Sequence, residues 1–282
     1  MDAIITHEPT IRLAVFVSAL ALFVVWEVAA PSRLRVKPRL TRWIANAGLV
    51  VIDTVLLRIA FPLLAVGAAL WASGSGIGLF NGLDAPFWLS VPLSILLLDC
   101  AIYWQHVLTH RVPMLWRLHR VHHSDHDVDV TTALRFHPFE IAFSMGLKIG
   151  LVVALGAPAA AVVLFEVILN GMAMFNHANA RLPRWLERPL RWLVVTPEMH
   201  RIHHSQDEAE TNSNYGFNLS LWDRIFGTYQ RQSAHGKEFA LGLSDYERAP
   251  TDNLLWTLTL PLETPSATRD SDDGPTAADK HA

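Results

Sequence analysis

The sequence predicts an all-α integral membrane protein that carries a histidine-rich site for two metal ions. Of its 282 residues, 51% are hydrophobic and only 17% are charged, and they include ten Trp and thirteen Phe. The mean hydropathy is +0.25, and such long apolar runs are typical of membrane-spanning proteins rather than soluble enzymes. Eleven of the fourteen histidines lie between His106 and His204, so one part of the chain holds most of the potential metal ligands.

Four apolar stretches predict about four transmembrane helices. The first three cover residues 11–30, about 44–71 and about 86–108. The fourth covers residues 141–175 and is interrupted by a Gly-Ala-Pro sequence at 156–158. Because glycine and proline break helices, its two halves predict either two short spans or a helical hairpin that enters and leaves on one side.

A basic segment between the first two spans predicts the orientation. Short loops rich in Lys and Arg remain in the cytoplasm, so the N-terminus lies outside and the later histidine segments lie on the cytoplasmic side. We therefore expect a multi-pass protein of a bacterial inner membrane with its metal site facing the cytoplasm. The basic residues are Arg33, Arg35, Lys37, Arg39 and Arg42.

Eight histidines form three clusters with helical spacing. On an α-helix, positions i, i+3 and i+4 share one face, so each cluster is expected to direct its imidazoles to one side. Neutral imidazole is a ligand suited to iron, zinc and copper. A single zinc is usually satisfied by four ligands, so this number of histidines indicates two ions. The clusters are His106 and His110, then His119, His122 and His123, then His200, His203 and His204.

Several other protein sites are excluded by the composition. The chain has a single cysteine, Cys100, which excludes an internal disulfide, a cysteine-ligated zinc and an iron–sulfur cluster within this chain. The net charge of −3 gives no reason to expect a nucleic-acid partner.

Two residues of the third span lie on the same helical stripe as the first histidine pair. Asp99 and Tyr103 precede His106 by seven and three residues. An Asp near the end of a span is costly unless it points inward and is paired. We expect Asp99 to orient a ligating imidazole through its free N–H. Tyr103 is expected, like Asp99, to lie behind a ligating histidine. The alternative is that Tyr103 is an aromatic anchor at the membrane interface.

The last apolar segment contributes a further candidate ligand. Glu166 and His177 share a helical stripe, which makes His177 a ninth ligand and Glu166 an intramembrane carboxylate that needs a partner. His177 as an ordinary hydrogen-bonded histidine is the alternative. His137 either helps to orient a metal-ligating residue or orders the turn at the following proline, Pro138.

The ordered motifs resemble the fatty acid hydroxylase/sterol desaturase superfamily of membrane di-iron enzymes, in particular its bacterial members. The resemblance covers about residues 90–230 and depends on the order of the three histidine boxes. Several members carry a further H-x-x-x-H before the last box, whereas Ala173 stands here four residues before His177. The motifs are Asp99-x-x-x-Tyr103-x-x-His106-x-x-x-His110, His119-x-x-His122-His123, Arg135-Phe136-His137-Pro138-Phe139-Glu140, His200-x-x-His203-His204, Asn214-Tyr215-Gly216, Leu221-Trp222-Asp223-Arg224 and Gly227-Thr228.

The resemblance implies a non-haem di-iron centre that activates O₂ and attacks an unactivated C–H bond of a lipid dissolved in the bilayer. It implies two iron ions, for which zinc substitutes in preparations, and no separate protein acid or base. The electrons would come from an external ferredoxin- or cytochrome-type donor with an NAD(P)H reductase. Hydroxylation and desaturation are both compatible with it, and so are sterol-like and fatty-acyl substrates.

These observations predict three regions. Residues 1–88 form N-terminal transmembrane helices, residues 89–250 form the catalytic region with spans and a cytoplasmic helical cap, and residues 251–282 form a disordered polar tail. A histidine-ligated metal transporter is one alternative, but it would place its ligands along a path in mid-membrane. A catalytically inactive lipid-binding relative is another, but it would be expected to have lost a histidine box.

Overall fold

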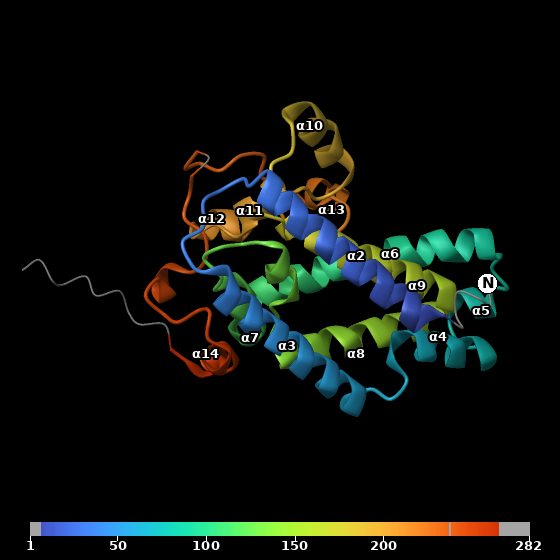
Figure 1. Ribbon diagram of the computed structural model, residues 1–282. Coiled ribbons are helices and arrows are strands. Elements are labelled where there is room, and N and C mark those ends of the chain that lie inside the picture. The colour runs from blue at the N-terminus through green and yellow to red at the C-terminus, as the bar shows by residue number, and fades with distance from the viewer. Residues whose placement is uncertain (1–6, 237, 265–282) are drawn as a thin grey trace, which may run out of the picture.

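The computed structural model describes residues 7–236 and 238–264. Over these residues the chain is helical, with isolated β-bridges and no strand, which confirms the all-α prediction. Long helices form a bundle, and shorter helices form a cap over one end of it (Figure 1). The bundle contains α2 (Glu8–Ala29), α3 (Arg39–Ala60), α4 (Leu64–Gly74), α5 (Leu79–Gly82), α6 (Phe87–Arg111), α8 (Pro138–Leu155) and α9 (Ala159–His177). The cap contains α7 (Pro113–His123), η1 (Val130–Leu134), α10 (Arg184–Leu193), α11 (Pro197–His203), α12 (Glu208–Thr211), α13 (Leu221–Ile225), η2 (Ser244–Tyr246), α14 (Leu254–Thr259) and η3 (Leu260–Leu262).

Five segments of the bundle are long and apolar enough to cross a membrane, so the chain is an integral membrane protein. About four spans were expected, and the difference lies in the last apolar stretch. Gly156 ends α8 with a φ of 62°, and Pro158 precedes α9; a left-handed glycine ends a helix and a proline favours a new start. The five segments are Glu8–Ala29, Arg39–Gly82, Phe87–Arg111, Pro138–Leu155 and Ala159–His177.

The α8–α9 pair returns the chain to the capped end of the bundle (Figure 1). Near the start of α8, Glu140 hydrogen-bonds to His119, and at the end of α9, His177 lies beside His122. Both outer ends of the pair therefore lie on one side of the bundle, as both alternatives for this stretch had assumed.

Small residues allow the helices of the bundle to approach closely. Ala65 and Ala69 of α4 are almost fully buried and belong to one cluster with Val152 of α8 and Phe165 of α9. Lipid tails are as apolar as these side chains, so close packing rather than hydrophobic burial drives helix association in a bilayer. The opposite surfaces are apolar and exposed, as at Leu22 with 63% exposure, which suits contact with lipid.

Two glycines cross at the end of the bundle that lies away from the cap. Gly78 has a φ of 103°, and a Cβ added to it would overlap the backbone N and Cα of Gly156. Gly78→Ala therefore combines overpacking with an unfavourable backbone angle. We expect it to reduce the free energy of unfolding by about 2–4 kcal/mol, seen as a lower Tm in detergent. Gly82→Ala is the matched control, because no heavy atom lies within 4 Å of a Cβ there; equal Tm values for both variants would contradict the expectation.

A buried ion group joins the start of α3 to the chain that follows α7. Arg42 is 1% exposed; its Nε and Nη2 donate to Asp125 at 2.8 and 2.6 Å, and its Nη1 donates to Asp129 at 2.8 Å. Burial opposes ionisation of Asp125, but the Arg42 guanidinium lowers the pKa of this carboxyl below its usual value. Arg42 thus has a structural role beyond the topology signal expected for the basic segment.

The first part of the predicted disordered tail is ordered. Residues 251–264 are ordered and contain α14 and η3, so the boundary at 251 is wrong for this part. The reason is apolar packing: Leu260 is fully buried in a cluster with Leu49 of α3 and Val121 of α7. The remaining residues, 265–282, lie outside the described residues.

Candidate metal centre

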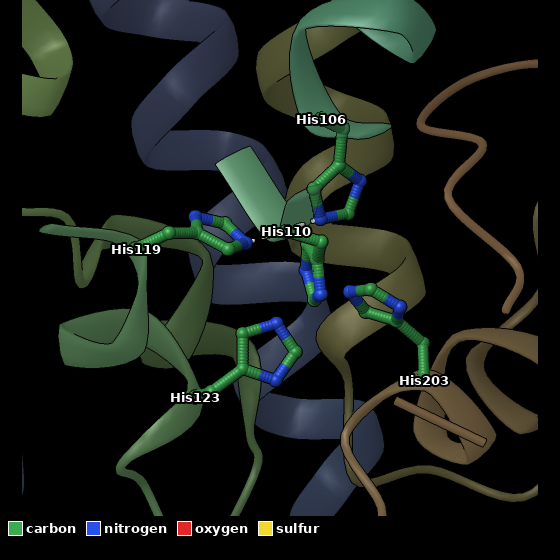
Figure 2. A group of neighbouring side chains, drawn as sticks. All are labelled: His106, His110, His119, His123 and His203. Atoms are coloured by element: carbon green, nitrogen blue, oxygen red, sulfur yellow. Dashed lines mark hydrogen bonds between the residues drawn. The ribbon is translucent and has the colours of Figure 1, made fainter. Parts of the chain in front are cut away.

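The nine histidines expected as ligands come together in two groups that lie at the junction of bundle and cap. Within each group, one ring nitrogen of every residue lies within 4.8 Å of those of the others. Figure 2 shows the rings of the first group pointing toward one another. The first group is His106, His110, His119, His123 and His203, and the second is His122, His177, His200 and His204.

Each three-histidine box contributes to both groups. In α7, His119 and His123 belong to the first group and His122 belongs to the second. The box at α11 is divided in the opposite way, with His203 in the first group and His200 and His204 in the second. Each i, i+4 pair therefore serves one group. The expectation that all three imidazoles of a box point to one site is wrong, because the remaining imidazole of each box reaches the other group.

Local sequence signals determine where the ligand helices begin. Pro113 follows α6 and occupies the first turn of α7, and Pro197 occupies the first turn of α11 behind the N-cap Thr196. Proline is favoured at the first helical position, and threonine accepts a hydrogen bond from the first turn. The Thr196 side chain accepts from the Met199 N–H at 3.4 Å. These two short helices, with the α11 C-cap residue His204, carry six of the nine candidate ligands.

Oxygen atoms hold the Nδ1 side of five rings. The Nδ1 of His119 lies 2.6 Å from Glu140 Oε1. The Nδ1 atoms of His106, His203 and His177 each lie 2.7 Å from a backbone carbonyl, and that of His122 lies 3.2 Å from another. A carbonyl oxygen only accepts, so Nδ1 must carry the proton and the lone pair must be on Nε2. This fixes the tautomer that presents Nε2 to the group. The carbonyls belong to Tyr215, Ser213, Ala173 and Arg135, in that order.

The Nε2 lone pairs face one another at short distances. His122 and His177 have their Nε2 atoms 3.0 Å apart, and those of His106 and His119 are 3.1 Å apart. Two lone pairs cannot form a hydrogen bond, so these contacts are repulsive unless a cation lies between the rings. With a metal–nitrogen bond of about 2.1 Å, ligands at right angles lie about 3.0 Å apart and those at tetrahedral angles about 3.4 Å apart. The arrangement therefore fits metal ligation.

Unpartnered ring nitrogens support the same interpretation. Among the described residues, His110 Nε2, His203 Nε2 and both ring nitrogens of His123 are buried without a hydrogen-bond partner. Burial, followed by the neighbouring imidazoles, lowers the pKa of His123 and His203 well below the usual value for histidine. His122, His200 and His204 have lowered pKa values for the same reasons. Neutral imidazole is the form that binds a metal.

Asp99 and Tyr103 lie away from the rings. Asp99 Oδ2 accepts from Trp222 Nε1 at 2.8 Å and from the Leu219 N–H at 3.3 Å. The expected contact between Asp99 and an imidazole is absent among the described residues, because seven residues of helix place it about 10 Å from His106 along the axis. The Tyr103 hydroxyl bonds to Thr228 at 2.9 Å. Both residues therefore contact the segment of residues 219–228 rather than a histidine.

Glu166 and His137 also have other partners. Glu166 pairs with Lys148 and, at 2.6 Å, with Arg12, which supplies the partner that an intramembrane carboxylate needs. His137 is the N-cap of α8; its Nδ1 accepts from the Phe139 N–H at 3.2 Å, and its Nε2 lies 3.3 Å from the Leu258 carbonyl. The structure thus supports the alternative in which His137 orders the turn.

Glu140 is the partner of a ligand that sequence reasoning missed. It lies two residues after Pro138, in the first turn of α8, and is 5% exposed. A signal was available in the motif of residues 135–140, where an acid follows the histidine at helical spacing. That motif directed attention to His137 because histidine is the more common ligand. The structure instead assigns the contact with a candidate ligand to the carboxylate.

Replacing Glu140 with Gln is expected to weaken metal retention. The carboxylate accepts from His119 Nδ1 at 2.6 Å, which increases the basicity of the ligand, and loss of such a partner costs about 10–100-fold in metal affinity or activity. Metal per chain, measured by mass spectrometry during titration with a chelator, tests this. Glu247→Gln is a control at an exposed acid. Equal chelator resistance of both variants and the unchanged protein would show that Glu140 does not tune the site.

Asp223 holds the loop that supports His106. Its Oδ1 and Oδ2 accept from the N–H groups of Tyr215 at 2.7 Å and Gly216 at 2.9 Å, and the Tyr215 carbonyl in turn holds His106. Burial raises the pKa of Asp223 to about 6. Asp223 is thus held by backbone hydrogen bonds, while the Arg224 guanidinium lies 4.3 Å above the Trp192 ring.

Apolar spanning helices and nine converging histidines define an integral membrane protein with a candidate histidine-ligated dimetal centre. Residues 91–228, which include all nine of these histidines, match the family described as fatty acid hydroxylase. Over this segment, which is just under half of the chain, the sequence is similar to the fatty acid hydroxylase family. No solved structure gives a significant match to the chain.

Several curated proteins are similar to the same region. An ornithine lipid hydroxylase of Rhizobium tropici is 33% identical over 51% of this chain and 43% of its own length. The human alkylglycerol monooxygenase is 30% identical over 53% of this chain and 32% of its own length. A very-long-chain aldehyde decarbonylase of Arabidopsis thaliana is 31% identical over 45% of this chain and 21% of its own length. The chain thus spans less than half the length of these relatives.

Proposed function

We propose that the two histidine groups hold two iron ions and that the protein is an O₂-dependent lipid hydroxylase or desaturase. The observation that carries this proposal is the set of facing Nε2 lone pairs, because only a cation between the rings makes those contacts favourable. Bound iron would supply the activation of O₂ and, with two electrons from a ferredoxin- or cytochrome-type donor, the attack on an unactivated C–H bond. The resemblance of the motifs and the hydroxylases among the relatives favour iron over zinc.

The residues of the chain position the ligands and determine their protonation. Glu140 and four backbone carbonyls keep a proton on Nδ1 of five rings, so that Nε2 remains available. Burial keeps the remaining rings neutral and excludes bulk water. The protein contribution to the reaction is therefore a preorganised ligand set, which needs no additional acid or base.

The substrate in this proposal is a bilayer lipid with a sterol-like or fatty-acyl body. The candidate ligands occupy the last two turns of α6, the last residue of α9 and the cap. A lipid moving between the apolar helices would meet the metals at the interface between membrane and cap. By the distribution of basic residues, this face is the cytoplasmic side of a bacterial inner membrane, where a soluble electron donor and its reductase have access.

Lipid analysis of cells with and without the intact gene tests the proposal. An added oxygen in one lipid class would identify a hydroxylase, and a loss of two hydrogens would identify a desaturase. Iron content of the purified protein is the accompanying measurement, with about two ions per chain expected. An unchanged lipid profile together with altered cellular zinc would instead favour the metal transporter.

A further inference from the structure

An arginine-rich cavity in the cap has no role in the proposed reaction. Its volume is about 1230 Å³. It lies between the segment after α2, helices α10 and α11, and the loop that follows Tyr229. Eight arginine and three glutamate side chains line it, so its charged groups have an excess of five positive charges.

The glutamates of the cavity do not neutralise this charge. Glu187 Oε1 accepts from Arg191 Nε at 2.7 Å, and Glu198 lies 3.6 Å from Arg191 as well. Arg201 lines the cavity without a hydrogen bond or ion pair within the part of the chain that the structure describes. Arg33 Nη1 is buried with no partner among those residues. A guanidinium partly removed from water without a direct ion pair is costly. Glu187, Glu198 and Glu238 are too few to balance eight arginines, so the cavity is suited to an anion.

The arginine lining of the cavity favours an oxyanion ligand such as a phosphate. Guanidinium groups form paired N–H donors that match phosphate oxygens and bind them in a bidentate manner. Arg33 and Arg201 belong to separate segments, one after α2 and one in α11. A ligand contacting both would therefore connect the end of the first span to the helix that carries His200 and His203.

The surroundings of the cavity place it at a membrane surface. Helix α10 is separated from α9 by six residues and exposes Trp185 at 76% and Trp192 at 67%. Leu34, which lines the cavity, is 94% exposed. Tryptophan is enriched at membrane interfaces, and an amphipathic helix with arginines on one face and Trp or Leu on the other lies in the headgroup layer. These features favour a lipid over an acidic soluble protein as the occupant.

We propose that this cavity binds the phosphate of an anionic lipid headgroup, with the acyl chains in the bilayer beside α2 and α10. The site is distinct from the histidine groups, because α11 directs His200 and His203 to the metal groups while Arg201 lines the cavity. An occupied site holds α11 in place from the side opposite to the candidate metals. Binding at this site does not depend on whether the lipid is also oxidised.

Binding measurements on the full chain in neutral detergent test the proposal. Dihexanoyl phosphatidylglycerol is titrated against the delipidated protein, with native mass spectrometry counting bound lipid and Trp fluorescence following the cavity. We expect one saturable site for this lipid and weaker binding of dihexanoyl phosphatidylcholine, since its choline cation is repelled by the arginines. Saturable binding of inorganic phosphate as tight as that of the anionic lipid would show that the ligand is a free anion and would overturn the lipid assignment.

Paired substitutions connect the binding to the cavity. Arg33→Gln with Arg181→Gln is expected to weaken phosphatidylglycerol binding at least about tenfold, because two charge-assisted contacts are lost. Arg248→Gln is the matched control at an exposed arginine outside the cavity. Arg188→Gln with Arg231→Gln, both exposed and lining the cavity, replaces the first pair if that variant does not fold.

Metal content separates this site from the histidine groups. The arginine variants should retain the metal of the unchanged protein while losing lipid. Lipid affinity that is equal in the cavity variants and in Arg248→Gln would overturn the proposal. So would retention of an acidic ferredoxin by the unchanged protein, lost in the cavity variants, together with no saturable lipid binding; the cavity would then dock an electron donor.

Discussion

Replacing either His122 or His203 with Ala is expected to abolish lipid oxidation and to lower the iron content from about two ions to about one per chain. The two residues belong to different groups, since His203 is in the five-histidine group and His122 is in the four-histidine group. Loss of a direct ligand should exceed the roughly 10–100-fold effect that loss of an outer partner causes. Iron analysis of the purified variants and the lipid profile of cells that produce them are the two measurements.

His235→Ala is the control for these two variants. His235 is exposed and pairs with Asp207 at 2.8 Å, outside both histidine groups. We expect it to retain full metal content and product. The dimetal interpretation fails if His122→Ala and His203→Ala retain both ions, or if product formation survives in either of them. A variant that loses its helical circular dichroism would be replaced by His200→Gln, which preserves more of the side-chain volume.

Replacing Arg42 with Met is expected to destabilise the protein by about 3–5 kcal/mol, because two buried carboxylates lose the cation that is hydrogen-bonded to both of them. Arg42 contacts Asp125 at 2.6 Å and Asp129 at 2.8 Å, and all three side chains are at most 3% exposed. The expected result is a large decrease in Tm in detergent. Metal should be lost as well, since Asp125 lies two residues after His123 in the chain.

Two further variants test the cause of this effect. Arg39→Met removes a neighbouring arginine whose guanidinium lies 5.7 Å above the Trp43 ring, an interaction of about 0.5–1 kcal/mol at exposed sites. Arg42→Lys keeps the charge but loses the paired donors, and an intermediate Tm is expected. If Arg42→Met and Arg39→Met lower the Tm equally, the buried ion group does not hold this part of the cap.

Much of the candidate site could be predicted from local spacing. His106 and His110, and each three-residue box, follow the helical period, and a dense set of imidazoles in an apolar chain has few uses other than metal binding. His177 was accessible because it continues the stripe that contains Glu166. The stripe of His106 misled at Asp99, because sharing a helix face says nothing about distance along the axis.

The partners of the ligands were beyond local reasoning. Every residue has a backbone carbonyl, so the Tyr215 and Ser213 carbonyls that hold His106 and His203 leave no signal in the sequence. Buried ion pairs such as Arg42–Asp125 join residues far apart in the chain. The sequence therefore indicated Arg42 as a topology marker, whereas its burial follows from how α3 packs against the loop after α7.

Hydropathy and helical period are local properties, so the amino-acid sequence is enough to predict a helical chain embedded in a membrane, with eight boxed histidines and His177 as candidate metal ligands. Three further features became visible only in the folded chain: the histidines divide between two groups, Glu140 contacts His119, and eight arginines line one cavity. Each of these results depends on side chains from distant segments meeting at one place. Packing of the helices determines such meetings, and no periodicity within a single segment encodes them.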